Sequence, residues 1–246
     1  MATLDTPAAD VPTWTMLFSA LPAPASISDT TGTGYHVTVT GYGRSGSGTT
    51  GASYGIDYRR KTAENFLGLL GSLDDIDSFL FGEPGGYTQN LYQTDLDDPT
   101  RENPFDFNIF KDDALPNEGG TAGGDSGGPL ILDQAFSEKT ILGVLSGGSR
   151  YFLEQPASSY GGSSFYQPLY LFWDWIAQNN PYRYATAKAG DGKWSDPDHW
   201  VTALDPNYRI IDSNGALVNG VPTSPGAGAF GADDAQKFGQ LCYQPT

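Results

Sequence analysis

A seven-residue run, from Gly123 to Pro129, holds four glycines around one serine and constrains the fold more than any other part of the sequence. Glycine adopts backbone conformations that are closed to other residues, so the run predicts tight turns. Apolar runs at 129–132 and 141–145 each lie next to glycine and predict two strands. We therefore expect Ser126 to stand on an exposed turn that leads into a β structure.

The remaining patterns also favour a mostly β chain. Residues 35–40 alternate with a period of two and predict a half-buried strand, 41–51 a loop, and 60–73 strand and turn. The acidic segment 74–125 is expected to be loop-rich. A stripe at helical spacing predicts a helix over about 168–178, formed by Leu169, Phe172, Trp173 and Ile176.

After Pro181 the sequence changes to short pieces punctuated by Gly, Asp, Asn and Pro. This change in composition predicts a boundary near residue 184, which gives domains at 1–184 and 185–246. The second segment is rich in Gly and Asp and bears Trp194 and Trp200. We interpret it as a β and loop extension, with a small carbohydrate-binding or packing module as the alternative.

Charge and composition exclude several classes of function. The net charge of −16 and the pI of about 4.2 disfavour nucleic acid and anionic membranes as partners. No apolar stretch is long enough to span a bilayer, and the first ten residues do not form a signal peptide. Cys242 is the only cysteine and cannot form an internal disulfide.

Metal and cofactor chemistry find little support in the sequence. Two histidines and one cysteine give no zinc spacing, so we expect no metal and no cofactor. The segment from Asp95 to Asp98 begins like a calcium loop, but Thr100 stands where such a loop needs glycine. A solvated loop is the preferred interpretation, and calcium binding is the alternative.

The chemistry of the glycine run centres on Ser126. Attack on a peptide carbonyl needs an exposed hydroxyl and backbone N–H groups aimed at the developing oxyanion. The spacing places the N–H groups of Gly124 and Ser126 where they can converge on one oxygen. The pattern therefore predicts a catalytic serine with an oxyanion hole.

The string Gly124–Pro129 resembles the nucleophile motif of the chymotrypsin/trypsin-like serine peptidases. The segments 41–43, 141–148, 161–166 and 169–176 are similar to further family landmarks in order and spacing. The resemblance implies a chymotrypsin-like second β-barrel with a C-terminal helix, the first barrel being largely missing. It also implies protein or peptide substrates and places Asp125 beside the nucleophile, where activated members pair it with a new amino terminus.

The resemblance further implies a specificity pocket formed by Gly120, Ser146, Gly147, Gly148 and Gly161. Gly120 would lie at the base of this pocket, where a trypsin-type enzyme carries aspartate. Without a carboxylate there, a buried lysine or arginine would be unpaired, so an apolar or neutral substrate side chain is expected. Glu118 lies close enough in sequence to upset this expectation.

The base that such a reaction requires is not evident in the sequence. The family order is His, Asp, Ser, and residues 2–7 match the end of the aspartate strand, so both partners would lie upstream of Met1. Asp5 falls past the strand and is a poor substitute. His36 is interpreted as a solvated or hydrogen-bonded surface residue on the polar face of its strand. His199 is interpreted as part of a turn or an aromatic cluster.

We therefore expect a secreted or bacterial cell-surface serine endopeptidase that is inactive as this fragment. The length of 44–123 and the Trp-bearing tail are similar to the peptidase region of autotransporter-type serine proteins, in which a passenger region follows. A missing N-terminal barrel or that passenger would then be a partner. The alternative is a non-catalytic binding or scaffold protein on the same fold.

Overall fold

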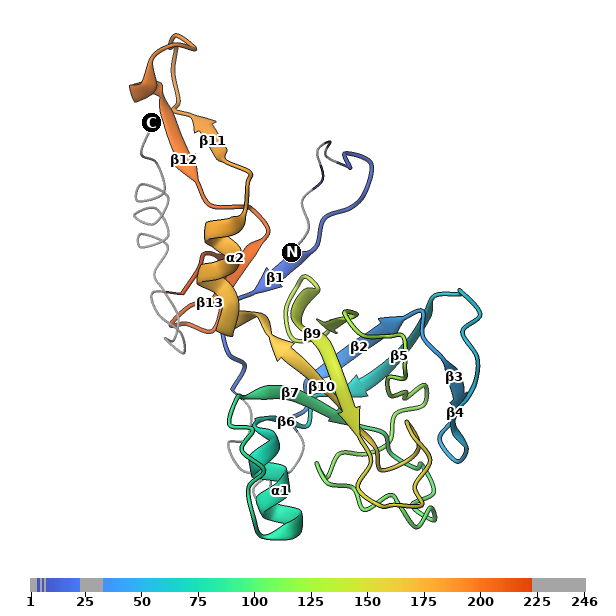
Figure 1. Ribbon diagram of the computed structural model, residues 1–246. Coiled ribbons are helices and arrows are strands. Elements are labelled where there is room, and N and C mark those ends of the chain that lie inside the picture. The colour runs from blue at the N-terminus through green and yellow to red at the C-terminus, as the bar shows by residue number, and fades with distance from the viewer. Residues whose placement is uncertain (1–3, 5, 7, 23–32, 223–246) are drawn as a thin grey trace. The chain divides into compact units, whose positions relative to one another are not determined.

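The computed structural model describes residues 4, 6, 8–22 and 33–222 (Figure 1). Two compact units make up the chain. Residues 21–168 form one, and residues 1–20 together with 169–246 form the other. Cys242 and Asp5 lie outside the described residues. The boundary expected near residue 184 stays a prediction.

The unit formed by residues 21–168 is built on an antiparallel sheet. Its strands pair in the order β5-β2-β8-β9-β10-β7-β6. Their bounds are β2 (His36–Gly41), β5 (Lys61–Phe66), β6 (Leu69–Gly71), β7 (Leu91–Asp95), β8 (Pro129–Leu132), β9 (Thr140–Ser149) and β10 (Ser163–Pro168). A separate hairpin joins β3 (Ser45–Ser47) to β4 (Gly51–Tyr54).

Only Leu67 and Gly68 separate the two end strands of this sheet, β5 and β6. The Leu67 N–H donates to the carbonyl of Tyr35, just before β2, and the Gly68 N–H donates to the carbonyl of Gln93 in β7. The strand pairing among the described residues does not form a closed barrel. The turn between β5 and β6 nevertheless bonds to segments at both ends of the strand order.

The predicted strands are confirmed, and alternation explains their burial. Val37 and Val39 of β2 are buried, while His36 and Thr38 on the other face are partly exposed. Opposite them, β8 buries Leu130 and Leu132. Each of these four aliphatic side chains is at most 4% exposed, so they form a dry core beneath the strand that leads out of the serine turn.

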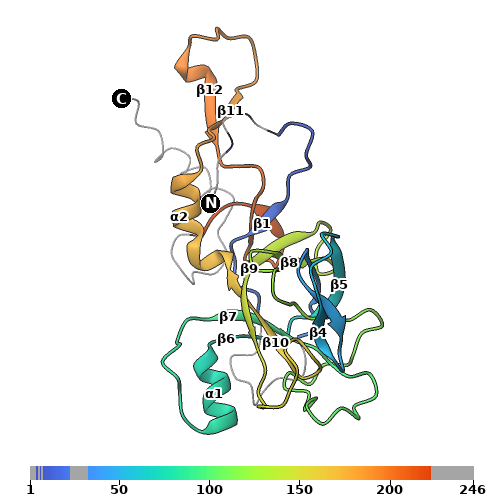
Figure 2. The same ribbon diagram turned by 45° about the vertical axis from the view of Figure 1, so that its right-hand side comes forward.

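The segment 74–125 is loop-rich, as expected, but it also contains one helix and one strand. A helix, α1 (Leu73–Phe81), lies beside β6 and β7 (Figures 1 and 2). A capping box between Ser72 and Asp75 starts it, and Gly82 ends it in the left-handed conformation. Asp74 and Asp75 thus stabilise the first turn of a helix, and their charge is not a sign of a loop.

Strand β7 is the second element in this segment. All five of its residues are buried, including the polar Gln93, Thr94 and Asp95. The Gln93 side-chain amide donates to the carbonyl of Gly71 at 3.0 Å. Polar residues in an interior strand conceal it from a pattern search, because such strands normally read as apolar runs.

The other unit contains the predicted helix and a small mixed sheet. A 3-10 turn, η2 (Leu169–Phe172), continues into α2 (Trp173–Asn179), which confirms the predicted helix. Of the stripe residues, Leu169 and Trp173 are buried but Phe172 is 40% exposed, so the buried face is narrower than the pattern predicted. Strand β1 (Thr15–Leu17) pairs in parallel with β13 (Tyr208–Ile211), and β13 pairs antiparallel with β14 (Leu217–Asn219). A hairpin of β11 (Tyr184–Ala187) and β12 (Trp200–Ala203) includes the 3-10 turn η3 (Pro197–His199).

Two aromatic contacts are notable in this second unit. The rings of Phe18 and Tyr208 meet edge to face with centroids 4.9 Å apart. Trp194 is highly exposed and meets Trp200 edge-on, with centroids 4.6 Å apart. In the part of the chain that the structure describes, no helix has the length and apolar character needed to cross a membrane.

The capping box of α1 gives a first testable prediction. Ser72→Ala removes the hydroxyl that accepts from the Asp75 N–H, so it should lower the free energy of unfolding by about 1 kcal/mol. Ser78→Ala, at an exposed position within the helix, is the matched control and should not destabilise. Urea unfolding of both variants measures the difference, and equal stability of the two would contradict the capping role.

Candidate functional site

Ser126 is exposed and lies within the second of two consecutive tight turns, which span residues 122–125 and 125–128. The Asp125 N–H donates to the carbonyl of Ala122, and the Gly128 N–H donates to the carbonyl of Asp125. The Gly127 N–H then bonds to Leu145 of β9, which ties the turn to the sheet. The expected exposed turn is therefore present, and it leads directly into β8.

The carboxylate of Asp125 holds the turn that bears Ser126 in place. One oxygen accepts the Gly43 N–H at 2.6 Å, and the other accepts the Ala122 N–H at 2.9 Å. The sequence did not identify a partner for this aspartate. In the structure the partners are two backbone amides, from the loop after β2 and from the loop before Ser126.

Glycines permit this close approach. A Cβ atom placed on Gly41 would lie 2.0 Å from the Asp125 carboxylate, and one on Gly43 would lie 2.6 Å from it. A Cβ on Gly128 would lie 2.7 Å from the carbonyl of Thr40. The similarity of 41–43 to a family landmark thus has a local physical basis, since any side chain there would displace Asp125.

The oxyanion-hole prediction is compatible with the backbone. Gly124 has a φ of 102°, a conformation that favours glycine. In the described part of the chain, neither the Gly124 N–H nor the Ser126 N–H takes part in a turn or ladder hydrogen bond. Both remain available to an incoming oxygen, and their convergence on one point stays a prediction.

A cavity of about 460 Å³ lies beside Ser126. Of the five residues predicted for the specificity pocket, Gly147 and Gly148 line it. Ser146 does not, and its hydroxyl donates to the carbonyl of Phe165. The structure therefore brings the second and third residues of the Ser146–Gly148 segment to the serine.

Gly120 and Gly161 lie elsewhere. Gly120 lines a second cavity of about 250 Å³, together with Glu118 and Asp125. Gly161 has a φ of 74° and packs against the loop at Phe105, where an added Cβ would lie 1.9 Å from a carbonyl oxygen. Sequence spacing alone could not separate the two cavities, because residues from strands and loops far apart in the sequence line both.

The loop between β9 and β10 adds lining residues that the sequence did not single out. Arg150, Ala157 and Ser158 line the cavity beside Ser126. This loop is bonded to the β3–β4 hairpin, because the Tyr160 N–H donates to Gly48 and the Ala52 N–H donates to Ala157. The one available signal was the position of Arg150, two residues after the glycine pair.

His36 occupies a polar site at the opposite end of β8. Its Nδ1 lies 2.6 Å from Asp133 and its Nε2 lies 3.1 Å from Glu64. The four residues of β8, which span about 13 Å, separate the level of Asp133 from the Ser126 turn. Hydrogen bonds to Asp133 and Glu64 raise the pKa of His36 in spite of its partial burial.

His199 belongs to the other unit. It closes the η3 turn by donating its backbone N–H to Asp196, and its ring packs edge-on against Trp200, with centroids 6.2 Å apart. These contacts agree with the turn and aromatic role expected for it.

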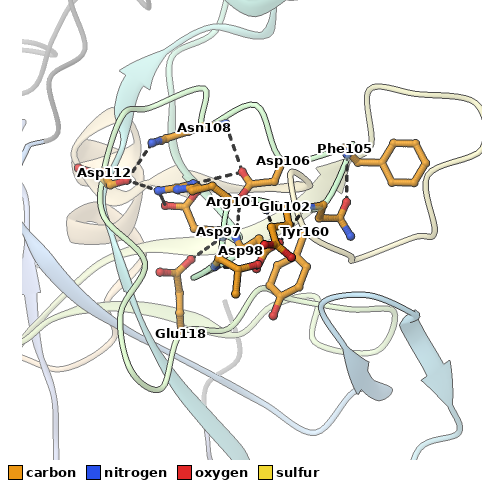
Figure 3. Close-up of polar contacts among 12 residues, drawn as sticks. Asp97, Asp98, Arg101, Glu102, Phe105, Asp106, Asn108, Asp112, Glu118 and Tyr160 are labelled. Carbon is orange, nitrogen blue, oxygen red and sulfur yellow. Dashed lines mark hydrogen bonds and ion pairs between the residues drawn. The ribbon is translucent and has the colours of Figure 1, made fainter.

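A cluster of carboxylates surrounds Arg101 in the loop between β7 and β8 (Figure 3). Arg101 pairs with Asp97 at 2.6 Å and with Asp106 at 3.1 Å. Asp98 accepts backbone N–H groups from Thr100 and from the two residues Glu102 and Asn103. Both oxygens of Glu118 also accept backbone N–H groups, from Asp97 and Leu115.

Burial is the main cause of the raised carboxyl pKa values in this cluster. It raises the pKa of Asp112 to about 7 and that of Glu118 to about 7, with Asp97 adding to both. One oxygen of Asp112 is buried and has no hydrogen-bond partner among the described residues. No group of three acidic, histidine or cysteine side chains in the described ranges is arranged to hold a metal ion.

Comparison with protein-family models gives no match, and no curated protein matches the chain.

The glycines beside Asp125 yield a second prediction. Gly41→Ala forces its methyl group into the Asp125 carboxylate and should lower the free energy of unfolding by about 1–3 kcal/mol. Gly55→Ala is the matched control, because no atom lies within 4 Å of its added methyl group and its φ is not positive. Thermal unfolding of both variants tests the contact, which would be refuted if Gly41→Ala were as stable as the control.

A third prediction concerns pH. The folded state holds protons on Asp112 and Glu118 that the unfolded chain releases near pH 4, so the free energy of unfolding should fall as pH rises from about 4 to 7. His36, with its raised pKa, contributes stability that is likewise lost as pH rises. Urea unfolding across this range should give greater stability at pH 5 than at pH 8.

Asp112→Asn should make this pH dependence shallower, because the amide cannot ionise. Asp191→Asn, at an exposed residue outside the acidic cluster, should leave the slope unchanged. If both substitutions changed the pH dependence of the free energy of unfolding equally, the buried Asp112 carboxyl would not be the cause of that dependence.

Proposed function

We propose that the chain is a serine-type endopeptidase in which Ser126 attacks the peptide carbonyl. The observation that carries this proposal is an exposed serine on a tight turn, beside the N–H groups of Gly124 and Ser126, which bond to none of the described residues. In the reaction, Ser126 Oγ bonds to the carbonyl carbon as its proton passes to a base. The amine then leaves with a proton, and water releases the acyl group.

The proposed scaffold is a chymotrypsin-like second barrel. It is supported by the strand order β5-β2-β8-β9-β10-β7-β6 and by the short link between its two ends. If β5 and β6 act as one bent strand, the sheet curls round on itself and its loops gather near the nucleophile. The bonds of Leu67 and Gly68 support this closure.

The general base is proposed to come from outside residues 21–168. His36 is the only histidine within that range, and both of its ring nitrogens are engaged beside Asp133 and Glu64. The same observation favours the alternative, a non-catalytic peptide-binding protein on this scaffold. Chemistry at Ser126 distinguishes the two.

A fluorophosphonate probe that labels activated serines provides the fourth prediction. The 246-residue chain should be labelled slowly, and Ser126→Ala should abolish the labelling. Ser149→Ala removes another hydroxyl from the same cavity and should leave the rate unchanged. Intact mass and peptide mapping identify the labelled residue, and labelling that survives Ser126→Ala would refute the nucleophile assignment.

The same assay locates the base. His36→Gln should not change the labelling rate, since His36 lies at the other end of β8 from the serine. A loss on His199→Gln would identify the base, and no effect of either change would assign it to a separate chain segment. Complete absence of labelling in a folded chain would favour the binding protein.

A further inference from the structure

The cavity beside Ser126 is lined by hydroxyl groups and a single charged side chain. Thr121, Ser149, Ser158 and Ser163 line it together with Ser126. The hydroxyls of Thr121 and Ser163 already bond to Ser164 and Tyr151, which leaves those of Ser149 and Ser158 for a ligand. Among the described residues that line the cavity, Arg150 is the only charged one, and none is a carboxylate. A cavity of this composition offers hydrogen bonds and one positive charge to whatever enters it.

Hydrogen bonds fix the loop that carries the Arg150 guanidinium. Its Nη1 donates to the carbonyl of Gln155 at 2.9 Å. The Gln155 side chain is fully buried, accepts the Tyr151 and Phe152 N–H groups and donates to the carbonyl of Tyr160. The buried amide therefore fixes the backbone that carries Arg150.

Arg150 also retains hydrogen-bonding capacity. A guanidinium has five N–H donors, and the structure gives it the one bond to Gln155 among the described residues. No carboxylate of the described residues forms an ion pair with it. Its charge is thus available in a protein whose net charge is −16.

We propose that Arg150 makes this cavity select peptides that carry an acidic side chain, glutamate or aspartate, at the residue placed next to Ser126. A carboxylate can accept from the guanidinium and from neighbouring hydroxyls, and such charge-assisted bonds are stronger than neutral ones. Lysine and arginine side chains would meet a like charge. The preference for apolar or neutral side chains expected from the sequence was derived without Arg150 in the pocket.

This inference rests on the proposed function, because it assumes that a peptide chain presents its residue to Ser126. It does not need the reaction to occur, since a cleavage product would place the same side chain in the cavity. Binding of product-like peptides can therefore be measured separately from the chemistry of the serine.

The fifth prediction is tested by titrating the ¹⁵N-labelled chain with acetylated tetrapeptides that end in Glu, Gln or Lys. The Glu peptide should bind roughly tenfold more tightly than the isosteric Gln peptide, and the Lys peptide more weakly than both. Chemical-shift changes should centre on the amides of residues 147–150. Equal affinity for Glu and Gln, or no binding of any peptide at millimolar concentration, would overturn the inference.

Variants separate local from global charge effects. Arg150→Gln should remove the preference for Glu and leave the affinity for the Gln peptide unchanged, whereas Arg150→Lys should restore part of it. Arg60→Gln makes the same change in net charge at an exposed residue outside both cavities and should have no effect. Equal weakening by Arg60→Gln and Arg150→Gln would show that the preference is not local.

The two proposals can fail independently. Ser126→Ala should keep the preference for Glu while it abolishes fluorophosphonate labelling. Labelling that survives Ser126→Ala, together with an intact preference for Glu, would refute only the serine chemistry. Labelling of Ser126 without any Glu preference would refute only the role of Arg150.

Discussion

The short contact between the Asp125 carboxylate and the Gly43 N–H is the constraint on which the candidate site depends. It joins the loop after β2 to the turn that carries Ser126, and the second oxygen of Asp125 ties in Ala122. The loop after β2, the loop before Ser126 and the turn that bears Ser126 are thereby held together. The glycines at 41, 43 and 128 are the means, because each leaves room that a single carbon atom would fill.

The site turn and the adjoining strands were predictable because their signals are local. Glycine around Ser126 specifies turns, and the alternation of Val37 and Val39 specifies a half-buried strand. Strand β7 was not predictable, since its buried Gln93 and Asp95 read as loop residues until their partners are known. The role proposed for Arg150 was hidden for a similar reason: it depends on a loop folded around the buried Gln155, which no short pattern encodes.

The acidic loop between β7 and β8 shows why counting charges is a poor guide to structure. Its carboxylates outnumber the nearby cation Arg101, yet Glu118 and Asp98 are directed at backbone N–H groups and order the chain around them (Figure 3). Burial leaves Asp112 and Glu118 protonated more readily than free carboxyls. The buried carboxyl groups of the loop thus ionise less readily than exposed ones. A segment whose sequence predicts exposure to solvent is part of the protein interior.

The loop between β9 and β10 is joined to two other segments by close backbone approaches. Tyr160 bonds to Gly48 in the β3–β4 hairpin, and Gly161 rests against the carbonyl of Phe105 with no room for a side chain. Such a loop cannot be exchanged by itself. A change in its length would have to be accompanied by matching changes near residues 48 and 105, so this loop could be engineered only together with two other, discontinuous segments.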